Sequence, residues 1–166
     1  LSEEELFPLV GDIDAIICGD DAITARVLDA APRLRVISKW GTGIDSIDQE
    51  AAAERGVKVC NTPNAFSEPV ADTVLGYILM FARNLDEMNR LVRDGLWVKP
   101  PSTALRESTL GIIGLGDCGK AVARRAAAFG MRVLANDLLP IPDAFIEQNG
   151  VEMVSKEQLL GEADFI

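Results

Sequence analysis

Hydrophobic residues in the first 64 positions fall into short runs, and segments with the 3.6-residue periodicity of helices separate these runs. The predicted strands are 14–18, 35–38 and 57–60, and the predicted helices are 2–10, 24–31 and 47–55. Ser2 and Glu5 have the spacing of a capping box at the start of the first helix. Short apolar strands that alternate with helices are typical of a parallel sheet covered by helices. Residues 1–64 therefore predict one α/β unit.

A second series of elements follows the segment 61–64, which breaks the pattern and marks the predicted domain boundary. One long helix is predicted from 67 to about 94, and its stretch 74–82 is apolar on every side, as in a helix buried between layers. The later predicted strands are 110–114, 131–136 and 151–154, and the later predicted helices are 118–129, 142–148 and 155–160. A further strand is predicted to begin at Ala163. Residues 65–166 thus predict a second α/β unit that begins with a long helix.

Composition excludes several classes of function. The chain contains no histidine, so no Ser-His-Asp or Cys-His nucleophile and no histidine acid-base catalyst can be built from these residues alone. The formal charge of −10 gives no electrostatic attraction for nucleic acid or an anionic membrane. The longest apolar run, 74–82, is much shorter than the about 20 residues of a membrane-spanning helix. We therefore expect no nucleic-acid or membrane partner.

The three cysteines are widely spaced and form no C-x-x-C motif. An odd number of cysteines at such spacing favours neither a disulfide framework nor a structural zinc site. We expect a cytoplasmic protein with no bound metal.

A glycine-rich motif stands between a strand and a helix of the second series. Residues 114–119 read Gly-Leu-Gly-Asp-Cys-Gly and match G-x-G-x-x-G. Asp137 follows Gly119 by 18 residues, close to the separation of about 20 that is typical of dinucleotide-binding units. The strand, the loop, the helix and the acid together favour a dinucleotide site.

Each part of this motif has its own physical role. Gly114 permits a tight turn, Gly116 lets a pyrophosphate approach the backbone, and Gly119 lets the helix pack closely on the strand. The start of the helix offers amide N–H groups to the phosphates. Asp137 would bind the ribose hydroxyls and repel a 2′-phosphate, which favours NAD over NADP. The predicted cofactor-binding residues of this motif are Gly114, Gly116, Asp117, Cys118, Gly119 and Asp137.

A competing interpretation starts from the same glycines. Residues 114–120 also satisfy G-x-x-x-x-G-K, the beginning of a P-loop. The next residue of a P-loop is Ser or Thr, whose hydroxyl binds Mg²⁺. Ala121 has no hydroxyl, so a P-loop nucleotide hydrolase is the less favoured alternative.

Several separated blocks resemble the D-isomer-specific 2-hydroxyacid dehydrogenases, and most closely their D-3-phosphoglycerate dehydrogenase branch. The blocks are 39–48 (KWGTGIDSID), 56–64 (GVKVCNTPN), 70–72 (VAD), 110–116 (LGIIGLG) and 129–131 (FGM). The resemblance runs from end to end. It implies that 1–64 is an incomplete flavodoxin-like substrate-binding domain without its first strand, and that 65–166 is the first half of a Rossmann NAD-binding domain.

The resemblance also implies a reaction and a set of substrate contacts. The reaction is the interconversion of a D-2-hydroxy acid and a 2-oxo acid by hydride transfer to or from NAD, in a homodimer. In the family a glycine-rich loop donates backbone N–H groups to the substrate carboxylate; this loop corresponds to Thr42 and Gly43, and Thr42 also reaches the nicotinamide end. Lys39 stands where phosphoglycerate dehydrogenases often carry Arg and could pair with a substrate carboxylate or phosphate. A solvated lysine at a strand end is the alternative.

The resemblance further implies that the catalytic Arg, Glu and His of the family match no position in this chain. We therefore expect these residues to be part of a longer enzyme and to be inactive alone. A non-catalytic NAD(H)-binding sensor or interaction module of the same fold is the alternative. Asp117 departs from the family, which often has Arg there, and its carboxylate would repel a phosphate.

Overall fold

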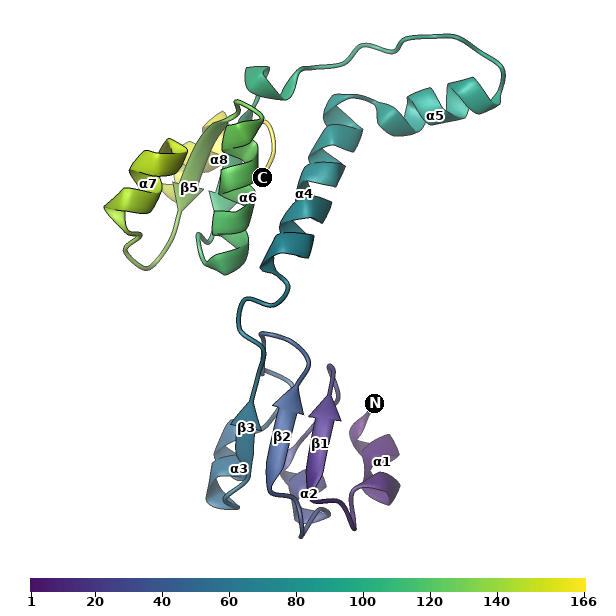
Figure 1. The fold of residues 1–166 in the computed structure, drawn as a ribbon, viewed down its shortest axis with the longest axis vertical. Coiled ribbons are helices and arrows are strands. Elements are labelled where there is room, and N and C mark those ends of the chain that lie inside the picture. The colour runs from purple at the N-terminus through teal and green to yellow at the C-terminus, as the bar shows by residue number, and fades with distance from the viewer. The chain divides into compact units, whose positions relative to one another are not determined.

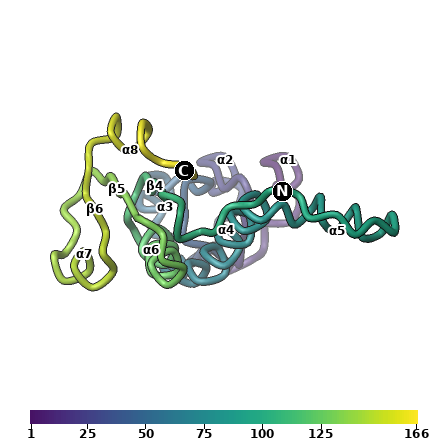
Figure 2. The backbone as a smooth tube through the Cα atoms, turned by 90° about the horizontal axis from the view of Figure 1, so that it is seen from above, coloured from purple at the N-terminus to yellow at the C-terminus, as the bar shows by residue number.

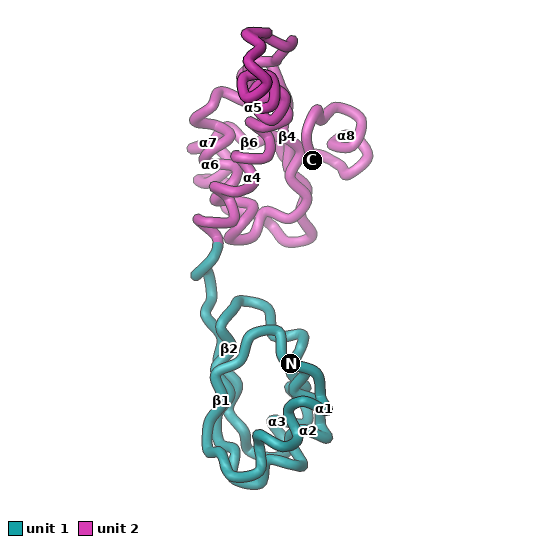
Figure 3. Tube along the Cα trace, turned by 90° about the vertical axis from the view of Figure 1, so that its right-hand side faces the viewer, with its two compact units in different colours: residues 1–66 teal, residues 67–166 magenta.

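The computed structural model describes all 166 residues. The chain divides into two compact units, Leu1–Phe66 and Ser67–Ile166, which have different colours in Figure 3. The division lies two residues after the boundary taken from the sequence. Each unit has its own three-stranded parallel sheet and its own buried core, so the α/β class and the two parallel sheets are confirmed.

Unit 1 (Leu1–Phe66) contains a sheet with the strand order β1-β2-β3, drawn as three arrows that point the same way in Figure 1. Its strands are β1 (Ala15–Cys18), β2 (Val36–Lys39) and β3 (Lys58–Cys60). Its helices are α1 (Glu3–Leu6), the 3₁₀ turn η1 (Phe7–Leu9), α2 (Ala25–Asp29) and α3 (Gln49–Glu54). The helix predicted over 2–10 stops being α-helical at Leu6, because Pro8 has no N–H for the next helical hydrogen bond.

Side-chain caps fix where the short helices of unit 1 begin. The predicted capping box is confirmed: Ser2 Oγ accepts from the Glu5 amide, and a Glu5 carboxylate oxygen accepts from the Ser2 amide at 2.8 Å. Thr24 and Asp48 accept from backbone amides in the same way at the starts of α2 and α3. Ile37 in β2 is fully buried in the core. The parallel strands all end at one edge of the sheet, so their following loops meet there.

Unit 2 (Ser67–Ile166) repeats this architecture with the strand order β4-β5-β6, all parallel. Its strands are β4 (Thr109–Ile113), β5 (Arg132–Asn136) and β6 (Val151–Met153). Its helices are α4 (Ser67–Ala82), α5 (Leu85–Arg93), the 3₁₀ turn η2 (Leu105–Glu107), α6 (Asp117–Ala128), α7 (Asp143–Asn149) and α8 (Lys156–Glu162). Where a strand was predicted to begin at Ala163, Phe165 forms one isolated parallel bridge with Leu110.

The single long helix predicted over 67–94 is wrong, because the structure has two helices there. Asn84 adopts a left-handed backbone with φ 51° between α4 and α5, a conformation that Asn tolerates better than most residues. Its side-chain amide donates to the Pro101 carbonyl. Figures 1 and 2 show α5 extending away from the sheet of unit 2.

The prediction that the apolar stretch 74–82 is buried between layers is also wrong, because only one side of it is covered. One face of α4, which includes Leu75 and Ile78, lies in the core of unit 2. The helix packs against α6, and Figure 2 shows the two side by side. On the opposite side Tyr77 and Phe81 are 59% and 71% exposed. The apolar composition of this stretch is the same all round, so periodicity could not reveal which face packs. None of the helices has the length and apolar character that crossing a membrane requires.

Candidate functional site

The predicted phosphate loop lies where β4 ends and α6 begins. Gly114 has φ +94° and its amide donates to the Asn136 carbonyl at 2.8 Å, which holds the turn against the end of β5. A Cβ atom at Gly119 would lie 2.1 Å from the Gly114 carbonyl oxygen. Only glycine fits at this contact, so the structure supports the packing role that the motif predicts for Gly119.

The N-terminus of α6 is open to a ligand. Gly116 precedes the helix, and no side chain caps its first turn, so the first backbone N–H groups have no helical partner. The Cys118 thiol donates to the buried Ser67 hydroxyl, at a distance of 3.7 Å between sulfur and oxygen. Asp117 is exposed and stabilises the positive end of the helix dipole. This carboxylate would repel a phosphate that approaches the first amides of α6.

Asp137 is joined to the loop by hydrogen bonds. Its two carboxylate oxygens accept from the Leu139 amide at 2.8 Å and the Leu115 amide at 2.5 Å. These amides hold the pKa of Asp137 below its usual range, so the group is ionised at neutral pH. A carboxylate accepts about four hydrogen bonds, and the remaining positions suit the two hydroxyls of a ribose. The open helix end, the close glycine contact and this acid together fit an NAD molecule.

A pocket of about 550 Å³ lies in unit 1 where β1 and β2 end. The loop after β2 forms one side of it and is fixed to the segment after β3. The Gly41 amide donates to Thr62 Oγ1 and the Thr62 amide donates to the Gly41 carbonyl, both at 3.0 Å. Asn61 Nδ2 donates to the Thr42 carbonyl at 2.7 Å. The loop is therefore held by the Gly41 amide and by the carbonyl groups of Gly41 and Thr42.

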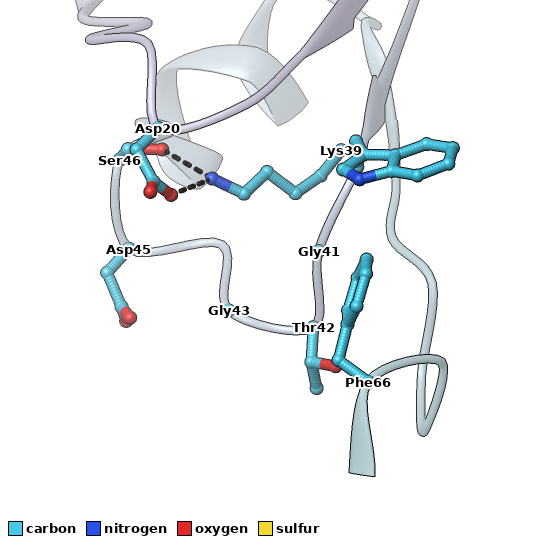
Figure 4. Close-up of a pocket in the computed structure, with 9 residues that line it drawn as sticks. Asp20, Lys39, Gly41, Thr42, Gly43, Asp45, Ser46 and Phe66 are labelled. Carbon is cyan, nitrogen blue, oxygen red and sulfur yellow. Dashed lines mark hydrogen bonds and ion pairs between the residues drawn. The ribbon is translucent and has the colours of Figure 1, made fainter. Parts of the chain in front are cut away.

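The backbone N–H groups of Thr42 and Gly43 donate to no group of this chain. Both residues are exposed and both line the pocket, and Figure 4 shows them along the bend of the loop. A carboxylate accepts strong hydrogen bonds from amides held in this way. The geometry suits the carboxylate-binding role predicted for these two residues.

Lys39 lies in the same pocket with its side chain almost fully buried, 4% exposed. Its ammonium donates to the Gly19 carbonyl, to Asp20 Oδ1 at 2.6 Å and to Ser46 Oγ at 3.4 Å, and Figure 4 shows it reaching Asp20 and Ser46. The alternative of a solvated lysine is wrong. Contact between Lys39 and a substrate stays a prediction.

Sequence reasoning missed several residues at this pocket. The missed residues are Asp20, Asp45, Ser46, Asn61, Thr62 and Phe66. The signal that could have found most of them is the parallel sheet, because loops that follow neighbouring parallel strands meet at one edge.

Most of unit 2 matches the profile of a known protein family. A family profile described as the NAD binding domain of D-isomer specific 2-hydroxyacid dehydrogenase matches residues 75–166. The chain belongs to the D-isomer-specific 2-hydroxyacid dehydrogenase family. Residues 75–166 of unit 2 therefore belong to the NAD-binding domain of that family, and the dinucleotide interpretation of residues 114–119 is favoured over the P-loop.

Three relatives show how far the similarity extends. The chain is 40% identical to a glyoxylate reductase of Korarchaeum cryptofilum, over 99% of this chain and 52% of the relative. It is 38% identical to a D-3-phosphoglycerate dehydrogenase of Methanocaldococcus jannaschii, over 100% of this chain and 32% of the relative. The structure of a D-lactate dehydrogenase from Aquifex aeolicus, complexed with NAD and lactic acid, matches with a TM-score of 0.87 and 28% identity, over 98% of this chain and 50% of that one. The chain spans about half the length of the glyoxylate reductase.

Two glycine substitutions separate folding from cofactor binding. Gly119→Ala forces a Cβ atom onto the Gly114 carbonyl, so we expect the free energy of unfolding to fall by at least about 2 kcal/mol in urea titrations. A Cβ atom at Gly116 would meet no other atom within 4 Å, and this residue has an ordinary φ of −72°. Gly116→Ala should therefore leave stability within about 1 kcal/mol and weaken NAD binding in calorimetry. Equal stability of the two variants would contradict the assigned packing contact.

We expect the charge of Asp137 to decide the choice between NAD and NADP. Asp137→Asn keeps the side-chain shape and one acceptor oxygen but removes the charge that repels a 2′-phosphate. We expect the ratio of the dissociation constants for NADP and NAD to fall by about tenfold or more. Asp86→Asn, the same change in α5, is the control and should leave the ratio unaltered. An unaltered ratio in Asp137→Asn would contradict the ribose role.

Proposed function

We propose that this chain is the cofactor- and carboxylate-binding part of an NAD-dependent dehydrogenase that interconverts a D-2-hydroxy acid and a 2-oxo acid. The observation that carries the proposal is the pair of amides at Thr42 and Gly43, which have no partner in the chain and face a pocket. A 2-hydroxy acid and its 2-oxo acid share one constant anionic group, the carboxylate. A rigid pair of amides can hold that group through the whole reaction.

Support for the cofactor half comes from unit 2. The uncapped first turn of α6 suits the pyrophosphate, and Asp137 suits the adenosine ribose. When bound, NAD supplies the hydride acceptor, and NADH the donor, for the carbon that bears the oxygen. The residues of this chain bind and orient the cofactor and the acid. None of them is assigned a proton transfer.

Proton transfer needs a group that these residues do not include. The chain has no histidine, and the resemblance implies a His–Glu pair as acid and base and an Arg that orients the substrate. We propose that the chain binds both ligands and does not turn them over by itself. The alternative is a non-catalytic NAD(H)-binding module. It uses the same residues of this chain to bind the cofactor, but the longer protein then supplies no proton donor.

A homodimer, as the resemblance implies, is part of the proposal. Tyr77, Phe81 and Trp97 are large aromatic residues of unit 2 that stay more than half exposed in this chain. Aromatic side chains are enriched in the cores of protein interfaces, so the exposure of these three residues supports an assembly in which they are covered.

Glycolate tests the proposed carboxylate contact directly. In ¹H–¹⁵N spectra of the 166-residue protein, glycolate should shift the amide signals of Thr42 and Gly43 most, because its carboxylate accepts from them. Glycolamide has the same shape without the charge and serves as the matched control; it should shift them little. Shifts spread evenly over both units, or an equal effect of glycolamide, would contradict the proposal.

A further inference from the structure

The one cation that lines the pocket of unit 1 is already neutralised. Lys39 is the only basic residue among the lining residues. All three protons of its ammonium have acceptors, and one of these acceptors is the carboxylate of Asp20 at 2.6 Å. The Asp20 side chain is 99% exposed, so Asp20 is reached from solvent while Lys39 is not. A ligand entering the pocket meets the acid of this pair first.

The position of the ammonium is fixed by its surroundings. The Lys39 stem passes Gly41 so closely that a Cβ atom on Gly41 would lie 3.2 Å from Lys39 Cε. A buried charge is stable only while it is paired and hydrogen-bonded. Turning the ammonium toward a second anion would give up Asp20 and two further acceptors. We therefore expect Lys39 to stay with Asp20 when a ligand binds.

The remaining charge in the pocket is negative. Asp45 also lines it, and a Cβ atom on Gly43 would lie 3.4 Å from the Asp45 carboxylate. Asp20, Asp45 and Lys39 together leave an excess of one negative charge among the lining residues. The two amides of the loop serve one carboxylate, and none of the lining residues supplies a further cation for a second anion.

The other lining groups suit an uncharged remainder of the ligand. The rings of Trp40 and Phe66 lie with centroids 6.1 Å apart and planes tilted by 60°, and both line the pocket. Aromatic surface of this kind packs against carbon and hydroxyl groups without compensating a charge.

We propose that this pocket takes 2-hydroxy and 2-oxo acids whose only anionic group is the carboxylate, and that the Asp20–Lys39 ion pair excludes phosphorylated acids. The inference rests on the proposed function, since it assumes that the acid binds at Thr42 and Gly43. Specificity arises here through a repulsive element as well as an attractive one. Among the kinds of relative that the chain matches, the glyoxylate reductase and the D-lactate dehydrogenase have fitting substrates, because glyoxylate and lactate carry no phosphate.

D-glycerate and 3-phospho-D-glycerate test the proposal, because they differ only in the phosphate. Their dissociation constants are measured from the Thr42 and Gly43 amide shifts of the 166-residue protein. We expect D-glycerate to bind at least about tenfold more tightly. Asp20→Asn removes the negative partner and leaves the Lys39 charge in place, so the preference should shrink by about tenfold. Asp20→Glu keeps the charge and should keep the wild-type preference.

Two further variants locate the effect. Asp14→Asn removes an exposed acid that lies just before β1 and pairs with Arg33. This variant should leave the preference for D-glycerate over 3-phospho-D-glycerate unaltered. Asp20→Asn combined with Lys39→Met should show no gain in phosphoglycerate binding, because the ammonium is gone. Thermal unfolding of each variant confirms that it is folded.

The outcomes separate the two proposals. Binding of 3-phospho-D-glycerate as tight as that of D-glycerate would overturn the inference and leave the proposed function standing. An unaltered preference in a folded Asp20→Asn variant would overturn the role of the ion pair. If neither acid shifted the Thr42 and Gly43 amides, the proposed function would fail and the inference with it.

Discussion

Parallel pairing of the strands is the constraint on which both candidate sites depend. In unit 1 the register pairs Cys18 with Lys39, so the loops after β1 and β2 begin side by side. In unit 2 the register pairs Ile113 with Asn136, which brings the turn at Gly114 next to the acid that follows β5. Each site therefore combines a loop that offers amides with polar groups from the neighbouring strand end.

The contact between Gly119 and the Gly114 carbonyl adds a requirement for one residue type to the constraint of parallel strand pairing. Parallel pairing alone places a loop and a helix at the end of β4, but the helix can start close to the loop only without a side chain at Gly119. Gly116 at the start of α6 has no side chain that could cap the first amides. A packing requirement at Gly119 and a binding surface after Gly116 thus arise from one short motif, which explains why the motif could be recognised from the sequence.

Local signals in the sequence predicted much of the fold. Capping at Ser2 and the short apolar strands are decided within a few residues, and the strands of both sheets begin and end within one residue of the predicted bounds. The break between α4 and α5 at Asn84 could not be predicted in this way, because the side chain of this left-handed residue donates a hydrogen bond to the Pro101 carbonyl, 17 positions later. Which face of α4 packs also depends on distant neighbours.

The surroundings of Lys39 are the clearest case of what local sequence could not predict. Its position in the motif suggested a free ammonium for an anionic substrate. Its partner Asp20 lies 19 positions earlier, and only the pairing of β1 with β2 brings the two together. The consequence is chemical: Lys39 is part of an ion pair with Asp20, and the proposed function therefore assigns recognition of the substrate carboxylate to backbone amides.

The central claim is that these 166 residues hold the cofactor and the acid but have no group for the proton. The most direct test mixes the 166-residue protein with NADH and glyoxylate and follows NADH binding by fluorescence and its oxidation by absorbance. The account predicts that NADH binds and that its absorbance stays constant over a time in which a full-length relative consumes it. Clear oxidation of NADH that scales with protein concentration would contradict the account.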